Sequence, residues 1–117
     1  MSLSLIKIIL SLLEKKLYNV KKGLDRMWEM LVRKHMVYHG RVQGVGFRYT
    51  AKRLANVLGL VGWVKNEYNG TVTLEVQGEQ ASIYRMMEGL NRDIYIDIEW
   101  IDSRDIPLRE ESCFCVK

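Results

Sequence analysis

The order of hydrophobic and polar residues changes at about residue 34, where a helical period gives way to shorter, alternating segments. Before that point, the run from Leu3 to Leu13 is mostly apolar, and its polar residues recur at spacings of three and four. This spacing predicts a helix with one narrow polar stripe and a broad apolar face. A second amphipathic helix is expected after Gly23, which we take as the break between the two. Its apolar face comprises Leu24, Met27, Trp28, Leu31 and Val32.

The remaining pattern alternates between strand-like and helix-like segments. Asn69-Gly70 is a strong tight-turn signal, and Gly59 is expected to cap the helix before it. The order predicts an α+β fold of the ferredoxin-like βαββαβ type, with helices on one face of an antiparallel sheet and a short strand added at the end. In that order, the expected strands cover residues 35–39, 61–65, 71–76, 97–104 and 112–116, and the expected helices cover 48–58 and 80–91. Ile98 and Trp100 are expected to share one side of the strand at 97–104.

Composition supports one globular domain with an N-terminal extension. The chain has 117 residues, of which 48% are hydrophobic and 27% charged. The net charge of +4 lies entirely in residues 1–33, because residues 34–117 hold 11 basic and 11 acidic side chains. The basic pI is therefore weak evidence for nucleic-acid binding, and no nucleic-acid partner is expected.

We divide the chain into an amphipathic extension, residues 1–33, and a domain, residues 34–117. The apolar run is far shorter than the roughly 20 residues that a membrane span needs. The extension could pack on its own domain, self-associate or lie on a membrane surface, and a protein contact is favoured. A further alternative is that translation starts naturally at Met27, Met30 or Met36.

The two cysteines, Cys113 and Cys115, are too close along one strand to favour a disulfide. We expect reduced thiols and a cytoplasmic protein. His35 and His39 are interpreted as structural or exposed, and Trp63 is expected to pack in the core.

The candidate functional residues are concentrated between the first expected strand and the first expected helix of the domain, from Gly40 to Arg48. A loop that enters a helix presents free backbone N–H groups and the positive end of the helix dipole, which together favour an anion. Gly44 and Gly46 let the backbone approach a ligand, and Arg48 offers a bidentate, always-charged donor to phosphate. On chemistry alone, a simple tight turn with a solvated arginine is an equally good interpretation.

The whole string Gly-Arg-Val-Gln-Gly-Val-Gly-Phe-Arg, residues 40–48, closely resembles the signature of the acylphosphatase family. A second block, residues 58–66, resembles the family's second signature, and the turn and strand at 69–72 follow it. The resemblance covers about residues 34–117, with Asn69 standing where many members carry aspartate. It implies a ferredoxin-like enzyme that hydrolyses the carboxyl-phosphate bond of acyl phosphates.

The resemblance also implies the site. Arg48 and backbone N–H groups of the loop would hold the phosphate, and the side-chain amide of Asn66 would orient the attacking water. No metal or cofactor is implied, and a phosphate or sulfate ion is expected to occupy the loop in place of substrate. The implied phosphate-binding residues are Gln43, Gly44, Val45, Gly46, Phe47 and Arg48.

The main alternative is a non-catalytic module of the same fold that binds an anion or docks a partner. A fragment of a larger carbamoyl-transfer enzyme would fit the motif but not the chain length. The intact pair of Arg48 and Asn66 favours the enzyme.

Overall fold

The computed structural model describes the backbone of residues 2–117 and the side chains of residues 2–24, 26 and 30–117. The chain divides after Met30 into two compact units, and the second begins at Leu31. Within the described residues, no helix combines the length and apolarity that a membrane crossing requires.

The first unit is one continuous helix, α1 (Leu3–Glu29), so the expected break at Gly23 is wrong. Gly23 does not take a positive φ, and a single glycine inside a helix costs only about 1 kcal/mol relative to alanine. The second expected helix also ends too late, because Leu31 and Val32 begin a strand and pair with Glu79 and Gly78. The apolar face expected at Met27 and Trp28 lies outside the described side chains.

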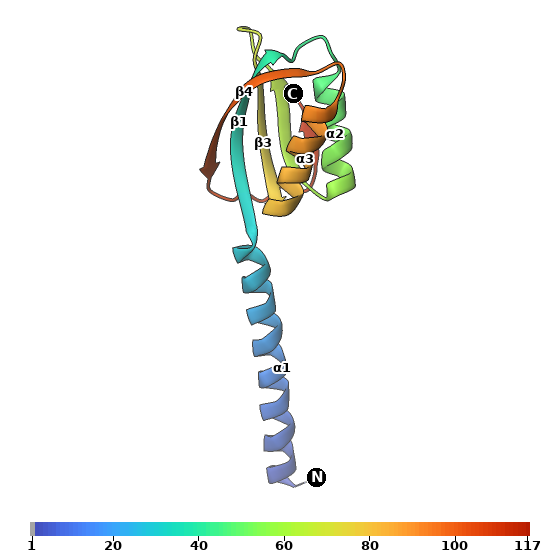
Figure 1. Cartoon of the computed structure of the whole chain (residues 1–117). Helices are drawn as coiled ribbons and strands as arrows, with labels where there is room; N and C mark the ends of the chain where they lie inside the picture. The colour runs from blue at the N-terminus through green and yellow to red at the C-terminus, as the bar shows by residue number, and fades with distance from the viewer. Residues whose placement is uncertain (1) are drawn as a thin grey trace. The chain divides into compact units, whose positions relative to one another are not determined.

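The second unit is an α+β sandwich in which α2 and α3 cover the same face of a sheet (Figure 1). This arrangement confirms the expected ferredoxin-like class, and the strand–helix–strand–strand–helix–strand order is the one that the sequence predicts. Its elements are β1 (Leu31–Arg41), α2 (Phe47–Leu58), β2 (Val61–Asn66), β3 (Val72–Glu79), α3 (Gln80–Arg92), β4 (Asp97–Ile106) and β5 (Phe114–Val116).

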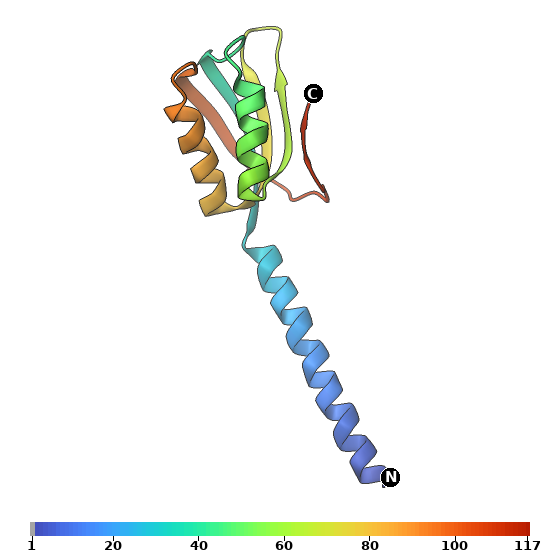
Figure 2. The same ribbon diagram turned by 90° about the vertical axis from the view of Figure 1, so that its right-hand side faces the viewer.

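The sheet is mixed rather than purely antiparallel. Its strand order is β4-β1-β3-β2-β5, in which the first four strands are antiparallel to their neighbours and β5 runs parallel to β2. After β4 the chain must travel from one edge of the sheet to the other before it forms β5 (Figure 2). The added last strand was expected, and this crossing gives it its parallel direction.

The core lies between the sheet and the two helices. Met36, Leu74 and Val64 supply its centre from three neighbouring strands, and each is fully buried. α2 and α3 contribute Ala51, Ala55, Ile83, Met86 and Leu90 to the same cluster.

Two expected features of the core are wrong. Ile98 and Trp100 do not share a face, because the register between β1 and β4 shifts at His39 and Gly40, which pair with Trp100 and Ile98. Such a bulge reverses the alternation, so Ile101 packs on the core while Trp100 is exposed and stacks on His39, with ring centroids 3.6 Å apart. Trp63 is only half-buried and lies outside the core cluster, with the Lys117 ammonium 4.4 Å from its ring.

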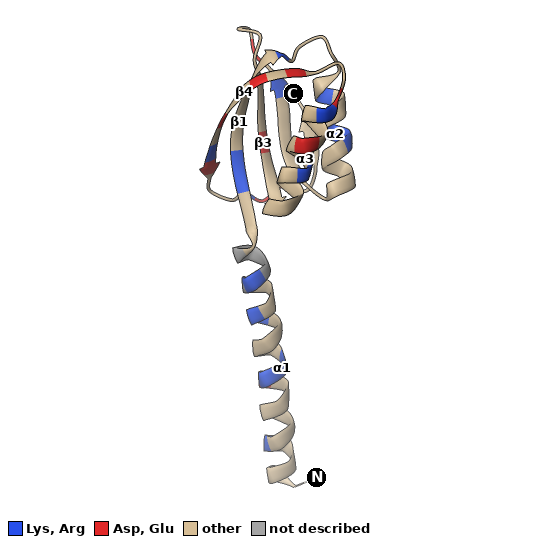
Figure 3. Cartoon of the chain, in the orientation of Figure 1, with Lys and Arg blue, Asp and Glu red and all other residues tan. Residues whose placement is uncertain are grey.

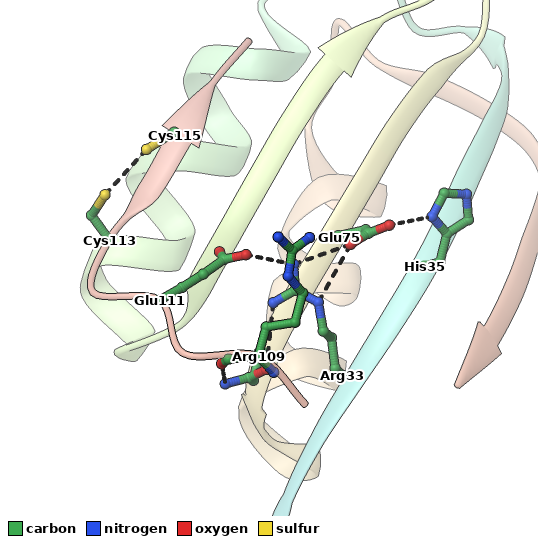
Figure 4. A network of polar contacts seen from close by, with 8 residues as sticks. Arg33, His35, Glu75, Arg109, Glu111, Cys113 and Cys115 are labelled. Atoms are coloured by element: carbon green, nitrogen blue, oxygen red, sulfur yellow. Dashed lines mark hydrogen bonds and ion pairs between the residues drawn. The ribbon is translucent and has the colours of Figure 1, made fainter. Parts of the chain in front are cut away.

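A buried ion network fastens the crossing segment to the sheet (Figure 4). Arg33 on β1 is 1% exposed, and its Nη2 lies 3.1 Å from Glu75 Oε1 and 2.7 Å from Glu111 Oε1. Gln77 adds two hydrogen bonds to the backbone of Arg109. These contacts hold the chain that leads to β5. Cys113, just before β5, and Cys115 within it are free thiols whose Sγ atoms lie 3.1 Å apart.

Candidate active site

The loop between β1 and α2 is anchored by the apolar residues of its own motif. Val42 and Phe47 are almost fully buried, and Val45 packs partly against the core. Phe47 meets Tyr38 edge-on, with ring centroids 4.9 Å apart. Because these side chains turn inward, the residues between them are held at the surface and Gly44 and Gly46 are exposed.

Both exposed glycines adopt the left-handed backbone conformation, with φ of 72° at Gly44 and 81° at Gly46. A Cβ at either position would meet nothing within 4 Å, so space does not require glycine there. The requirement is conformational, since a residue with a Cβ pays roughly 1–2 kcal/mol in this region. The two glycines therefore set the curl of the loop.

This curl leaves the backbone donors of the loop free. Gly46 is the N-cap of α2, and the first backbone bond at this end runs from Thr50 N to Gly46 O, at 3.0 Å. Within the described residues, no backbone N–H from Gly44 to Phe47 donates a hydrogen bond. Free N–H groups at the positive end of a helix dipole form an anion-binding site.

The loop borders a hollow of about 400 Å³. Arg48 from α2 and Asn66 from the end of β2 reach the same hollow, although they lie 18 positions apart along the chain. The residues that line it are Val42, Gly44, Gly46, Phe47, Arg48, Tyr49, Lys52, Asn66 and Val116.

The charge in the hollow is positive. Arg48 and Lys52 are both exposed, lie one turn apart on α2, and form no ion pair with any other described residue. Lys52 was not predicted as a site residue, although its spacing of four from Arg48 on a helix places both side chains on the same face. Two free cations beside free N–H groups favour a phosphate dianion.

Asn66 lies at the boundary of two hollows. It also lines a second one, of about 460 Å³, with Gln43, Lys65, Glu67 and Tyr68. Asn66 is half-buried, and its side-chain amide forms no hydrogen bond with another described residue. An amide that is held by its strand but free at its tip can bind a water molecule.

The side chain of Gln43 shapes the loop. Its Nε2 donates to the carbonyl oxygens of Glu67, at 2.6 Å, and Thr71, at 2.9 Å. Both donor hydrogens of the side-chain amide are thus engaged in tying the loop to the turn after Asn66. Any contribution of Gln43 to anion binding is left to its backbone.

The structure brings most of the predicted residues together. Gly44, Gly46, Phe47 and Arg48 share one hollow with Asn66, while Val45 does not line it. Within the described residues, no group of three or more His, Cys, Asp and Glu side chains is placed to hold a metal ion.

Comparison with known proteins agrees with this geometry. The family model described as acylphosphatase matches residues 34–115. An acylphosphatase from Bifidobacterium longum is 40% identical over 83 residues, which cover 70% of this chain and 86% of the relative. One from Oleidesulfovibrio alaskensis is 61% identical over 51 residues, covering 44% of this chain and 74% of the relative.

A solved structure gives the same result in three dimensions. The acylphosphatase from Coxiella burnetii superimposes with a TM-score of 0.72 at 32% identity, covering 78% of this chain and 97% of that one. The helix α1 lies entirely before the first residue that the family model matches. With two motifs, the fold and a family match over most of its length in agreement, this chain belongs to the acylphosphatase family.

Proposed function

We propose that residues 31–117 hydrolyse the carboxyl-phosphate bond of acyl phosphates to a carboxylate and inorganic phosphate. The observation that carries the proposal is the convergence of Arg48, Asn66 and the free loop N–H groups on one hollow. Family membership makes a phosphorylated acyl compound the substrate class. The acyl group itself is left open, because the polar groups of the hollow address the phosphate.

In this mechanism Arg48 holds the phosphate by paired charge-assisted hydrogen bonds, and the loop N–H groups bind its remaining oxygens. The side-chain amide of Asn66 orients a water molecule in line with the bond that breaks. The water oxygen bonds to phosphorus, the carboxylate leaves with the bonding electron pair, and the water proton ends on the phosphate. A carboxylate is a good leaving group, so positioning and charge stabilisation carry most of the catalysis.

Two features of the hollow support the division of work between Arg48 and Asn66. Arg48 lies at the first turn of α2, where the helix dipole and the loop donors act on the same anion. Asn66 is uncharged, so it can approach an anionic substrate without the repulsion that a carboxylate would bring. Its position at the end of β2 fixes its backbone by pairing with Val72.

The decisive assay is release of phosphate from benzoyl phosphate by the full chain, with a metal chelator present. We expect activity in the wild type and in Arg53→Ala, which removes an exposed arginine of α2 that does not line the hollow. Arg48→Ala should lower kcat/KM by about a hundredfold or more, and Asn66→Ala should act mainly on kcat. Full activity in both variants would contradict the proposal.

The same experiment tests the alternative of a non-catalytic module. A wild-type chain that binds inorganic phosphate through Arg48 and releases none from benzoyl phosphate would favour an anion-binding role. Calorimetric titration with phosphate separates the two cases. We expect binding together with turnover, and loss of both in Arg48→Ala.

A further inference from the structure

The helix α1 exposes an unusual amount of apolar surface. Among its described residues 3–24, large hydrophobic side chains are exposed along the whole helix, from Leu3 at 77% to Leu24 at 60%. An exposed apolar patch of this extent marks an interaction site. The proposed hydrolysis uses no residue of α1, so it does not explain this surface.

Leu5, Ile8, Leu12 and Tyr18 project to other sides of the helix, but the other exposed apolar residues of α1 form one continuous stripe. Their positions recur at spacings of three and four, which a helix places on one face. The stripe comprises Leu3, Ile6, Leu10, Leu13, Leu17, Val20 and Leu24, with Ile9 beside it.

The charged residues of the helix are mostly basic. Residues 2–24 contain five lysines and one glutamate, a net charge of +4, and Figure 3 shows basic segments recurring along α1. By helical geometry, Lys15 and Lys22 project opposite the stripe, whereas Lys16 and Lys21 border it on its two sides. Lysines at such borders can bury their methylene stems while the ammonium groups reach outward.

We propose that α1 binds an anionic lipid surface and lies in its plane. The apolar stripe would enter the boundary between headgroups and acyl chains, and the lysines would meet lipid phosphates. Charge complementarity favours an anionic lipid surface as the binding partner, because the helix is cationic and anionic headgroups attract clustered lysines. The helix lies on the bilayer and does not cross it, as its hydropathy requires.

The same lysines argue against a second copy of the chain as the occupant. The spacing of the stripe also fits a coiled-coil heptad, in which Lys7, Lys16 and Lys21 would flank the seam. A parallel pair would then place Lys16 opposite Lys21 of the other copy. A fully overlapping antiparallel pair would place Lys7 opposite Lys21. Like charges therefore face each other in both arrangements, whereas an anionic surface satisfies all of them.

The test is co-sedimentation of the full chain with vesicles of phosphatidylglycerol and phosphatidylcholine, against vesicles of phosphatidylcholine alone. We expect binding to the anionic vesicles only, weakened by high salt. Lys16→Gln with Lys21→Gln should lower the partition coefficient by about 25-fold, since each lysine at the border of the stripe contributes roughly fivefold at an anionic surface. As a charge-matched control, Arg53→Gln with Arg85→Gln removes two exposed cations from the other unit and should leave binding unchanged.

The apolar stripe is tested separately. Leu13→Gln with Leu17→Gln should abolish binding, whereas Ser4→Gln with Ser11→Gln on the polar face should preserve it. Benzoyl phosphate hydrolysis and circular dichroism report whether each variant is folded. Equal binding to both kinds of vesicle would overturn the charge-selective proposal. A chain that forms discrete oligomers by sedimentation and leaves anionic vesicles unbound would assign the stripe to self-association instead.

Discussion

The side-chain nitrogen of Gln43 lies 2.6 Å from the carbonyl oxygen of Glu67, and this contact joins the two halves of the candidate active site. Gln43 belongs to the loop that leads to Arg48, and Glu67 directly follows Asn66. A second bond from the same nitrogen to Thr71 O closes the clamp from the other side of the turn. The separation of Arg48 and Asn66 thus depends on a side chain that does not line the hollow they share.

Removal of this clamp is expected to lower activity more than its distance from the phosphate suggests. Gln43→Met keeps the length of the side chain but loses both donated hydrogen bonds. We expect kcat/KM to fall about tenfold, and stability to fall by about 1–3 kcal/mol because two carbonyl oxygens lose a partner.

Gln43→Glu should be worse than Gln43→Met, because it turns a carboxylate toward two carbonyl oxygens. Kinetics on benzoyl phosphate and urea denaturation measure the two effects. Wild-type kinetics in Gln43→Met would show that the loop and the turn keep their separation without the clamp.

Lys52 should contribute to substrate capture. It is an exposed cation in the hollow, one helical turn from Arg48. Lys52→Gln is expected to raise KM by roughly fivefold with little change in kcat, because an exposed charge attracts the dianion before and during the reaction alike. The difference from wild type should shrink at high ionic strength. An unchanged KM at low salt would remove Lys52 from the site.

Tyr38 carries a polar group that the fold does not use. Its hydroxyl is buried and has no hydrogen-bond partner among the described residues, and burial raises the pKa of the phenol. Tyr38→Phe keeps the edge-on contact with Phe47 and removes the unpaired group. The free energy of unfolding should therefore be unchanged or rise by up to about 1 kcal/mol.

The pH dependence of Tyr38→Phe supplies an independent check. Because the folded pKa of Tyr38 lies above its unfolded value of about 10, the contribution of its neutral form to stability is present below that pH and is lost above it. The variant should lose less stability than wild type in alkaline solution. A destabilised Tyr38→Phe protein would mean that the hydroxyl has a partner, such as a buried water molecule.

The sequence was sufficient for most of the domain, because its apolar periods are regular and the motif around Arg48 is specific. It failed where a long-range contact overrides a local pattern. Leu31 and Val32 continue the helical spacing, yet they pair with β3. Trp100 sits two positions from Ile98 and would share its face in a regular strand, but the bulge opposite His39 changes the register.

The site was predicted in the same uneven way. Residue identity and motif placement were enough to expect Arg48, Asn66 and the glycines near one another, and they line one hollow. The clamp by Gln43 depends on carbonyl oxygens 24 and 28 positions away, which no local pattern can indicate. Val116 reaches the hollow only because β5 pairs with β2 after the chain has crossed the sheet.

The position of a truncation should decide whether the catalytic unit survives. Deletion through Met30 should leave hydrolysis and stability of the remaining unit unchanged, because β1 begins at Leu31. Deletion through Arg33 removes the cation that Glu75 and Glu111 share. Loss of one partner from a buried ion pair costs about 3–5 kcal/mol, so the shorter protein should melt at a lower temperature.

Arg33→Met in the full chain separates the loss of charge from the loss of chain length. It should reproduce the lowered melting temperature of the protein from which residues 1–33 are deleted. Equal stability of both truncations would show that Arg33 contributes no net stability.

The same ion network should make stability depend on pH in the acid range. Burial by itself raises the pKa of Glu75, but hydrogen bonds and charge from His35 and Arg33 outweigh it and hold the pKa below its ordinary value. A carboxyl whose folded pKa is depressed stabilises the protein above its unfolded pKa, which is about 4.3 for glutamate. That contribution is lost as the pH falls through the lower, folded pKa.

Glu75→Gln should therefore be less stable than wild type at neutral pH and should lose less stability on acidification. The reason is that glutamine keeps the volume of the side chain but cannot pair with Arg33 as an anion. Urea denaturation between pH 7 and about 3 measures both slopes, since a folded-state pKa shift appears as a change of stability with pH. Glu110→Gln is the control: Glu110 is exposed, directly precedes Glu111 in the sequence, and its variant should follow the wild type. Parallel curves for wild type and Glu75→Gln would show that Glu75 gains no net electrostatic stabilisation from Arg33 and His35.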